Sequence, residues 1–323
     1  MSLRTSLRKN AYMAGHFLSY ALTPRCIYRH RLQQLLTELS NEERQLVAAR
    51  VDYYNRLTHP TTISNTFSVG GFRFPYSQKR RFTFYFFDMH EVVRYFPKQL
   101  RFCFLPGDVT HVPACPTFVK SRPIHGENAN SVILKLNKRR HFGWFVKNDK
   151  PFSEKKDMLV NRTNWSNANP LRRRLHEQFW NHPMCNVGKL CKEAEDIETP
   201  PTVKSFMSIR EQLDYKFIAC IEGNDVATSL KWVMSSNSIA VSPPLNYETW
   251  FMEGTLIPNY HYIEVNPDYS DLIEKLEYYS QHTEEAEAIV RHAHEYVAQF
   301  LDKRLERAIG LAVADKYFKL TNA

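Results

Sequence analysis

Over residues 217–254, short apolar runs alternate with segments of helical pattern. Two of the runs, Phe217–Ile221 and Ser238–Val241, are each long enough for one buried strand. The segment between them, residues 227–234, has helical composition and follows a polar turn. The pattern after the second strand predicts another helix over Tyr247–Gly254. The stretch is therefore predicted to form a strand–turn–helix–strand–helix unit of an α/β fold.

The same patterns predict the remaining elements. Strands are predicted at residues 72–76, 82–86, 101–105, 131–136, 157–160, 184–187 and 260–265. Helices are predicted at residues 32–39, 41–57, 170–180, 205–213, 270–279, 284–300 and 303–318. Ser40 and Glu43 form a capping box at the start of the second helix. A polar segment at 147–156 predicts a linker between domains at 1–150 and 151–302, with the helix at 303–323 packing back on the first domain.

The polar groups of the 217–254 stretch favour a phosphate site. A helix that begins directly after a strand points its free backbone N–H groups at the sheet edge, where they can bind an anion. Thr228 and Ser229 lie in the first turn of the predicted helix, with Lys231 within reach. Glu248 and Glu253, on the next predicted helix, offer carboxylates for ribose hydroxyls. These groups fit a nucleotide diphosphate on a doubly wound sheet. A capped helix with surface Ser, Thr and Lys residues is the structural alternative.

Asp108 lies in a Pro-Gly-Asp loop at the carboxyl end of the strand predicted at 101–105. Ligands of open α/β sheets gather at such strand ends, so the position suits chemistry. A turn Asp that caps its own backbone is the alternative. Further along the chain lies a basic cluster formed by Lys135, Lys138, Arg139, Arg140 and His141. It is interpreted either as cations that bind a phosphate-bearing acceptor or as a solvated turn between strands.

Several segments resemble glycosyltransferase family 90 in wording and order. They are EGNDVATSLKWVMSSNS, YETWFMEG, HYIEV and YSDLIEKLEYY, preceded by LPGDVTHVP, FVKSRPI, NANSVILKLNKRRHF and PFSEKKDMLVNR. Together they cover roughly residues 83–300, and their wording resembles the bacterial lipopolysaccharide branch of the family. The resemblance implies two facing doubly wound domains of the GT-B type, with the active site in the cleft between them.

The resemblance implies a general base at Asp108. In the eukaryotic branch, an Asp after a comparable strand has this role and is followed by an aromatic residue and proline. Here Val109 replaces the aromatic residue and Pro113 follows later. His111 is the second candidate for the base. The acceptor-binding residues inferred around this loop and the basic cluster are His111, Lys120, Arg122, Arg139 and Arg140.

The resemblance also implies a diphosphate pocket in the second domain. Family members usually carry Arg-Gly after an aromatic residue at the end of the domain's first strand. Arg162 is kept here, but Asn161 replaces the aromatic residue and Thr163 the glycine, which puts the tightness of that loop in question. Arg162 is predicted to stabilise the leaving diphosphate. The turn glycine Gly223 and Lys231, with the other polar groups named above, are predicted to complete the donor site.

The charge balance favours a polyanionic partner. The 323 residues carry 43 Lys and Arg against 34 Asp and Glu, a formal charge of +9. Nucleic acid, phosphorylated lipopolysaccharide and an anionic membrane surface all fit. Residues 1–31 contain six Lys and Arg and no acidic residue, which suits contact with anionic lipid headgroups or a solvated segment packed on the first domain. Without an apolar run of about 18 residues, a membrane span is not expected.

The cellular setting predicted for this chain is the cytoplasm, at the inner face of the membrane. A secretory signal is not apparent, because Gly15, His16 and Ser19 interrupt the apolar stretch at 13–22. The six cysteines include no C-x-x-C pair and are interpreted as reduced thiols of a cytosolic protein. A structural zinc site is not expected.

The chain contains no D-x-D pair, which a metal-dependent glycosyltransferase of the other common architecture would need to hold Mg²⁺ or Mn²⁺. No metal and no cofactor are therefore expected. The predicted activity is inverting transfer of a hexose from a UDP-sugar, UDP-glucose or UDP-galactose, to a lipopolysaccharide or lipooligosaccharide core acceptor. The alternatives are a nucleic-acid-binding protein, favoured by charge and by the basic run Arg172–Arg174 but lacking a recognised motif, and a non-catalytic glycan-binding relative.

Overall fold

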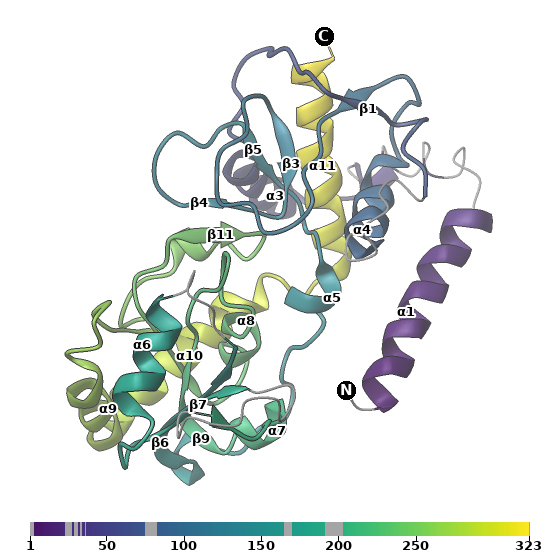
Figure 1. The fold of residues 1–323 in the computed structure, drawn as a ribbon. Coiled ribbons are helices and arrows are strands. Elements are labelled where there is room, and N and C mark those ends of the chain that lie inside the picture. The colour runs from purple at the N-terminus through teal and green to yellow at the C-terminus, as the bar shows by residue number, and fades with distance from the viewer. Residues whose placement is uncertain are drawn as a thin grey trace. The chain divides into compact units, whose positions relative to one another are not determined.

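The computed structural model describes residues 3–22, 28, 32, 34, 35, 37–74, 83–164, 170–190 and 203–322, with the side chains of 3–10, 21 and 203 left aside (Figure 1). The chain forms two compact units. Unit 1 comprises Met1–Arg139 and Asp302–Ala323, and unit 2 comprises Arg140–Leu301. The predicted assignment of acceptor binding to the N-terminal domain and donor binding to the C-terminal one stays a prediction.

Unit 2 contains a six-stranded parallel sheet. Its strands are β6 (Lys156–Thr163), β7 (Cys185–Leu190), β8 (Val203–Lys204), β9 (Tyr215–Ala219), β10 (Ile239–Ser242) and β12 (Ile263–Glu264). Their spatial order is β12-β10-β9-β6-β7-β8, and every pair is parallel. The chain starts at β6, moves outward to β8, returns to β9 and moves outward the other way. This is the doubly wound order, with its topological switch point between β6 and β9.

Unit 2 also contains several helices. The longer ones are α6 (Pro170–Phe179), α9 (Leu272–Gln281) and α10 (Thr283–Ala298); the shorter ones are α7 (Ile209–Gln212), α8 (Leu230–Val233), η2 (Phe152–Glu154) and η3 (Glu253–Thr255). Helix α6 contacts β7, α9 contacts β6, and both α8 and α10 contact β10. The parallel sheet with its helices confirms the predicted α/β class.

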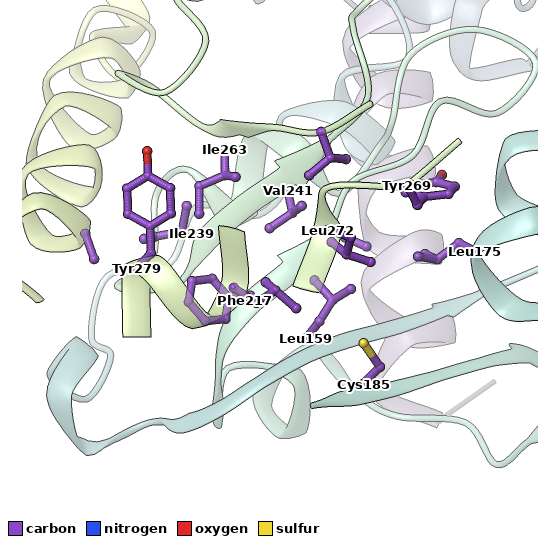
Figure 2. Packing of buried hydrophobic residues seen from close by; sticks show 14 of the residues in the cluster. Leu159, Leu175, Cys185, Phe217, Ile239, Val241, Ile263, Tyr269, Leu272 and Tyr279 are labelled. Atoms are coloured by element: carbon purple, nitrogen blue, oxygen red, sulfur yellow. The ribbon is translucent and has the colours of Figure 1, made fainter. Parts of the chain in front are cut away.

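The core of unit 2 follows from the strand registers. Leu159 is paired with Cys185 and with Phe217, and Phe217 is paired with Ile239, so these four side chains form a row on one face. Helices cover the row with Leu175 of α6 and Leu272 of α9 (Figure 2), and Leu276 of α9 belongs to the same buried cluster. Each such side chain contributes about 1.5–3 kcal/mol when fully buried. The apolar face fixes the register and thereby the positions of the strand ends.

Unit 1 joins helices to short strands. Its helices are α1 (Leu3–Leu22), α3 (Asn41–Tyr54), α4 (Thr83–Val93) and α11 (Lys303–Thr321), with α5 (Lys138–His141) at the boundary between the units; the strands are β1 (Phe67–Ser68), β2 (Arg101–Phe102), β3 (Thr117–Val119), β4 (Ser121–Pro123) and β5 (Ser131–Ile133). Strands β1 and β2 are antiparallel, whereas β3 and β5 are parallel. Helix α11 contacts α3, α4 and β2, so the C-terminal helix forms the centre of this unit.

The structure corrects the strand predicted at residues 82–86. From Thr83 onward this segment is part of helix α4. In the strand predicted at 72–76, residues 72–74 belong to no helix or strand, and residues 75–82 lie outside the described residues. The alternation of Phe84 and Phe86 suggested a strand. However, α4 buries Tyr85, Phe86 and Phe87 alike, because α1 and α11 both pack against it. A helix buried on several sides carries no clean period.

Several predicted elements of unit 2 also differ from the structure. The helix predicted at 227–234 is reduced to α8, which begins at Leu230, so Thr228 and Ser229 precede the helix and do not lie in its first turn. Residues 247–254 form strand β11 (Tyr247–Thr249) and the 3₁₀ turn η3 instead of a helix, so Glu248 lies on a strand. The predicted loop Asn161-Arg162-Thr163 continues strand β6, because it pairs with β7. The helix predicted at 205–213 is reduced to α7. The predicted capping box of Ser40 and Glu43 is confirmed. In the helix predicted at 32–39, the described residues 32, 34, 35 and 37 are helical, whereas 38 and 39 are not, and residues 33 and 36 lie outside the described residues.

Candidate functional site

The carboxyl ends of β6 and β9 meet at the switch point of the unit 2 sheet, where ligands of doubly wound folds bind. Asn161 lies there on the apolar face, with its side chain buried. Its amide Nδ2 donates to Ala219 O at 2.8 Å, and its Oδ1 accepts from Thr163 Oγ1 at 2.9 Å. His176 of α6 places its Nε2 2.9 Å from the same Oδ1. These bonds tie the ends of β6 and β9 to helix α6.

Arg162 is held by neutral acceptors. Its Nη1 donates to Asn186 O at 2.6 Å and to Asn161 O at 2.9 Å, and its Nε donates to Ser205 O at 3.0 Å. A further bond joins Nη2 to Asn186 Oδ1 at 2.8 Å. Within the described part of the chain, Arg162 has no carboxylate partner, and its positive charge is therefore not neutralised by an ion pair.

Arg172 connects α6 to the end of β9. Its Nη2 and Nε donate to Ile221 O at 2.9 and 3.2 Å, and its Nη1 donates to Asn164 O at 3.2 Å. A Cβ on Gly223 would lie 2.9 Å from Arg172 Nη2. Glycine at this turn thus leaves space for the guanidinium. The structure thereby gives the predicted site residue Gly223 a concrete steric role.

Burial and neighbouring cations both lower pKa values in this region. Burial is the main reason that the pKa of His176 falls to about 4, and the charges of Arg162, Arg172 and Lys204 lower it further. Burial also lowers the pKa of Arg172, and the nearby charge of Arg140 acts in the same direction. His176 is therefore neutral at pH 7, and its Nε2–H donates to Asn161 Oδ1. Cations gathered at strand ends are suited to binding an anion.

Lowering the pH should destabilise unit 2 through His176. In the unfolded chain His176 takes up a proton near pH 6.5, whereas its pKa in the folded protein is about 4. The contribution of neutral His176 to the free energy of unfolding is therefore fully present above pH 6.5 and is lost as the pH falls toward 4. The loss should approach about 3 kcal/mol. All five tryptophans lie in unit 2, so urea unfolding followed by tryptophan fluorescence measures it. His176→Gln should flatten the profile between pH 6.5 and 4.5; an unaltered profile would refute the assignment.

Lys231 and Glu253, predicted as separate donor contacts, form one buried ion pair. Lys231 Nζ lies 2.5 Å from Glu253 Oε1, and both side chains are completely buried. Glu253 also accepts from Thr249 N at 2.6 Å and from Thr249 Oγ1 at 2.9 Å. The rings of Phe142 and Phe251 lie 6.0 and 5.2 Å from the ammonium group. The pair therefore ties α8 to the turn that follows β11.

The other predicted donor residues lie near this pair in the fold. Thr228 and Ser229 are half-buried, and Ser229 Oγ contacts Cys220 Sγ at 3.4 Å. Glu248 is buried on β11. Glu222, which precedes Gly223, accepts from Asn246 N at 2.9 Å and from Tyr247 N at 3.0 Å. The end of β9 thus also anchors the segment that leads into β11.

Asp108 lies in unit 1, in the predicted loop after β2. Its Oδ1 is 2.5 Å from Lys120 Nζ; the Asp108 side chain is 27% exposed, while that of Lys120 is 2% exposed. Lys120 therefore holds a carboxylate that still reaches solvent. His111 is exposed on the same loop. Asp88, another carboxylate of unit 1, is buried in α4 and accepts from Tyr12 OH at 2.9 Å and from Lys138 N at 3.0 Å.

The predicted acceptor-binding cations differ in accessibility. Arg122 is completely buried and donates to the carbonyl oxygens of Tyr53 at 2.7 Å and Ser131 at 3.2 Å. Arg139 is half-buried, with its guanidinium 5.6 Å from the Phe84 ring, and Arg140 is exposed. In the basic cluster, Lys135 pairs with Glu306 and Lys138 pairs with Glu91. Arg139 and Arg140 are thus the more accessible cations of the predicted set.

Sequence reasoning missed the group formed by Asn161, His176 and Arg172. One signal for this group was present in the sequence: Asn161 is an amide at the end of a row of core-facing side chains, where an apolar residue is expected. The described residues contain no group of three or more His, Cys, Asp or Glu side chains that could hold a metal ion. No helix in the described part of the chain is long and apolar enough to cross a membrane.

Comparison with known proteins adds independent findings. The family model of glycosyl transferase family 90 matches residues 129–320. An O-glucosyltransferase LpsA from Dichelobacter nodosus is 40% identical over 281 residues, which cover 86% of this chain and 85% of the relative. An uncharacterized protein, 035R of Invertebrate iridescent virus 3, is 31% identical over 99 residues, covering 30% of this chain and 9% of that protein.

The doubly wound sheet with its cationic switch point and these matches define the class of protein as a glycosyltransferase. The chain belongs to glycosyltransferase family 90. The resemblance found in the sequence is thereby confirmed. Membership implies a sugar donor and a glycan acceptor.

Proposed function

We propose that this enzyme transfers a hexose, glucose in the first place, from a UDP-sugar to a lipopolysaccharide or lipooligosaccharide core acceptor, with inversion and without a metal ion. The observation that carries the proposal is the cationic switch point of unit 2, where Arg162 and Arg172 are held by neutral oxygens. The name of the Dichelobacter nodosus relative, an O-glucosyltransferase, supports glucose over galactose. A GT-B arrangement of the two units is part of the proposal.

The donor site has two parts in this account. Arg162 and Arg172 neutralise the charge that develops on the diphosphate, which side-chain cations can do in place of a metal ion. Thr228, Ser229 and Glu248 contact the donor, as predicted from the sequence. Lys231 and Glu253 are positioning residues, because their buried pair fixes α8 and Thr249 and therefore the shape of the donor site there. Gly223 keeps the space that the Arg172 guanidinium fills.

The reaction is a single displacement. Asp108 takes the proton from an acceptor hydroxyl, and the hydroxyl oxygen attacks the anomeric carbon of the sugar. The bond from that carbon to the β-phosphate oxygen breaks, and UDP leaves with the electron pair. A positioned base contributes about 10²–10⁴-fold. Lys120 holds the Asp108 carboxylate. His111, Arg139 and Arg140 contact the phosphorylated acceptor in this proposal, as expected from the sequence.

A panel of nucleotide sugars tests this function. The purified enzyme is incubated with UDP-glucose, UDP-galactose, UDP-N-acetylglucosamine or GDP-mannose, together with lipooligosaccharide from a truncated-core strain. Mass spectrometry of the acceptor should show the addition of one hexose with UDP-glucose. Transfer from UDP-galactose alone would change the sugar but keep the class. Absence of transfer or hydrolysis with every donor and acceptor in the panel would contradict the proposal.

The cytoplasmic membrane face is the proposed place of action, and α1 supplies the contact. One side of α1 faces α4, through Tyr12 near Phe84 and Tyr20 near His90, with ring centroids 5.8 and 4.8 Å apart. The other side exposes apolar residues, namely Phe17 at 49%, Leu18 at 55% and Leu22 at 73%. The segment up to residue 31 carries six Lys and Arg and no acidic residue. Apolar residues beside cations are typical of helices that bind anionic bilayers.

Sedimentation with liposomes should show this binding. Binding should require anionic lipid, fall steeply with salt, and weaken when Arg4, Arg8 and Lys9 are changed to Glu, because each cation contributes about 1 kcal/mol at an anionic surface. Leu18→Ser with Leu22→Ser should also weaken it. Leu301→Ser, at a leucine that is 51% exposed in unit 2, is the matched control. Binding that is independent of salt, or no binding at all, would count against the proposed contact.

A further inference from the structure

Two thiols of unit 1 lie in contact beside the loop that carries Asp108. Cys103 Sγ is 3.6 Å from Cys115 Sγ, which is a contact distance for two sulfur atoms. Both are free cysteines; Cys103 is buried, while Cys115 is half-buried. A disulfide requires about 2.05 Å between the sulfurs, so the two atoms need to approach by about 1.5 Å. Sequence alone did not indicate this pair, because residues 103 and 115 are far apart in the chain and form no C-x-x-C motif.

The backbone holds the two cysteines next to each other. Cys103 N donates to Tyr317 OH at 3.0 Å, and Tyr317 OH donates to Pro116 O at 2.9 Å, so a single side chain of α11 connects both ends of the loop. In addition, Phe118 N donates to Cys103 O at 3.0 Å. The proximity of the sulfurs thus follows from the fold, because three hydrogen bonds fix the chain on both sides of residues 104–114.

We propose that Cys103 and Cys115 form a redox-sensitive thiol pair, which a hydroperoxide converts reversibly into a disulfide that closes the loop of residues 103–115. The loop contains Asp108, so the bond would tie down the segment that carries the candidate base. The link to catalysis rests on the proposed function, whereas the bond itself does not.

The chemistry takes two steps. The Cys115 thiolate attacks the peroxide, so that an S–O bond forms, the O–O bond breaks and Cys115 becomes a sulfenic acid while the departing oxygen leaves as water or an alcohol. The Cys103 sulfur then attacks the Cys115 sulfur. The S–S bond forms, hydroxide leaves, and the Cys103 proton converts it to water. Overall, two thiols lose two hydrogens and the peroxide gains them. An added dithiol returns both cysteines to the thiol form by exchange.

The surroundings of Cys103 and Cys115 determine which thiol reacts with the peroxide first. Burial raises the pKa of Cys103 to about 11, and its hydrogen bond with Cys115 acts in the same direction. Burial also acts to raise the pKa of Cys115, but its hydrogen bonds with Ser64, Cys103 and Thr117 outweigh this effect, so that pKa lies below its usual value. Cys115 is also the more exposed of the two. It is therefore the thiol that reacts with the peroxide, and Cys103 resolves the sulfenic acid.

Cys185 and Cys220 provide an internal comparison. Both are buried, and burial raises the pKa of each thiol to about 12. A thiol reacts with peroxide as the thiolate, so both should stay reduced while Cys115 is oxidised.

Peptide mapping after peroxide treatment tests the proposal. The native protein is titrated with hydrogen peroxide, alkylated and digested, and the peptides are identified by mass spectrometry. The expected result is a linked pair of peptides that contain Cys103 and Cys115, lost after dithiothreitol, with Cys185 and Cys220 still alkylated. The closed loop should also raise the thermal unfolding midpoint by several degrees. Neither readout depends on transfer activity, so failure here and failure of the proposed function are distinguishable.

Variants make the result decisive. Cys115→Ser should abolish the linked peptides and the thermal shift, and Cys103→Ser should leave Cys115 oxidised to the sulfenic acid or beyond. Cys220→Ser should leave both readouts unchanged. The proposal is overturned if wild-type Cys115 is oxidised while Cys103 remains alkylated, if Cys115 pairs with a different cysteine, or if the pair stays reduced under peroxide that oxidises the other cysteines.

Discussion

Asp108→Asn is expected to reduce sugar transfer by roughly 10²-fold or more while UDP binding stays unchanged. The amide keeps the shape of the side chain and an oxygen that can accept from Lys120, which lies 2.5 Å away in the native enzyme. What it lacks is the ability to take a proton from the acceptor hydroxyl. Initial rates with UDP-glucose and calorimetric titration with UDP measure the two quantities separately.

His111→Ala is the matched control for this prediction. His111 lies on the same loop and is exposed, so its removal tests the loop without removing the carboxylate. We expect a much smaller loss of rate. The opposite ranking would assign the base to His111. If neither change affects turnover, the role carried over from the family is wrong at this loop. Asp88 would be a poor substitute, because it is fully buried and bonded to Tyr12.

Lys231→Met is expected to destabilise unit 2 by about 3–5 kcal/mol, since it leaves the buried Glu253 carboxylate without its cation. Both side chains of the native pair are completely buried, so water cannot take over the role of Lys231. Urea unfolding followed by tryptophan fluorescence measures the change, because every tryptophan belongs to unit 2. The double variant Lys231→Met, Glu253→Gln should regain part of the loss.

An exposed ion pair on α6 gives the control. Arg173 and Glu177 are each about half exposed, with 2.6 Å between Arg173 Nε and Glu177 Oε1, and Arg173→Met should cost less than about 1 kcal/mol. If Lys231→Met leaves the free energy of unfolding unchanged but lowers UDP affinity, Lys231 contacts the diphosphate directly, as the sequence pattern suggested. The buried pair would then not have the positioning role proposed for it.

The sequence predicted those parts of the fold that local pattern determines. The strands around Phe217 and Val241 are short apolar runs between turn residues, and the capping box at Ser40 depends on residues only three apart. Segment 82–86 was misassigned because burial on several sides of α4 removed the helical period. The predicted helix at 247–254 failed for a different reason: the carboxylate of Glu222, distant in sequence, holds Tyr247 N in an extended segment.

The candidate site was predictable only in part. Gly223 and Arg162 were proposed from the family resemblance and stay predictions as site residues, while the structure shows that Arg172 approaches Gly223 closely. The pairing of Lys231 with Glu253 depends on tertiary packing between α8 and η3, and no spacing in the sequence encodes it. The same holds for His176, whose contact with Asn161 requires α6 to lie on β7.

Calorimetric titration with UDP in excess EDTA tests the central claim, that cations at the switch point of unit 2 bind the diphosphate without a metal ion. Binding should persist after chelation and should weaken about 10- to 100-fold in Arg172→Gln, since a charge-assisted hydrogen bond contributes about 1.5–3 kcal/mol. Gly223→Ala should weaken it as well, because the new Cβ would lie 2.9 Å from Arg172 Nη2. Arg173→Gln, one residue along the same helix, should leave affinity unchanged. Loss of UDP binding on chelation, or equal affinity in wild type and Arg172→Gln, would contradict the account.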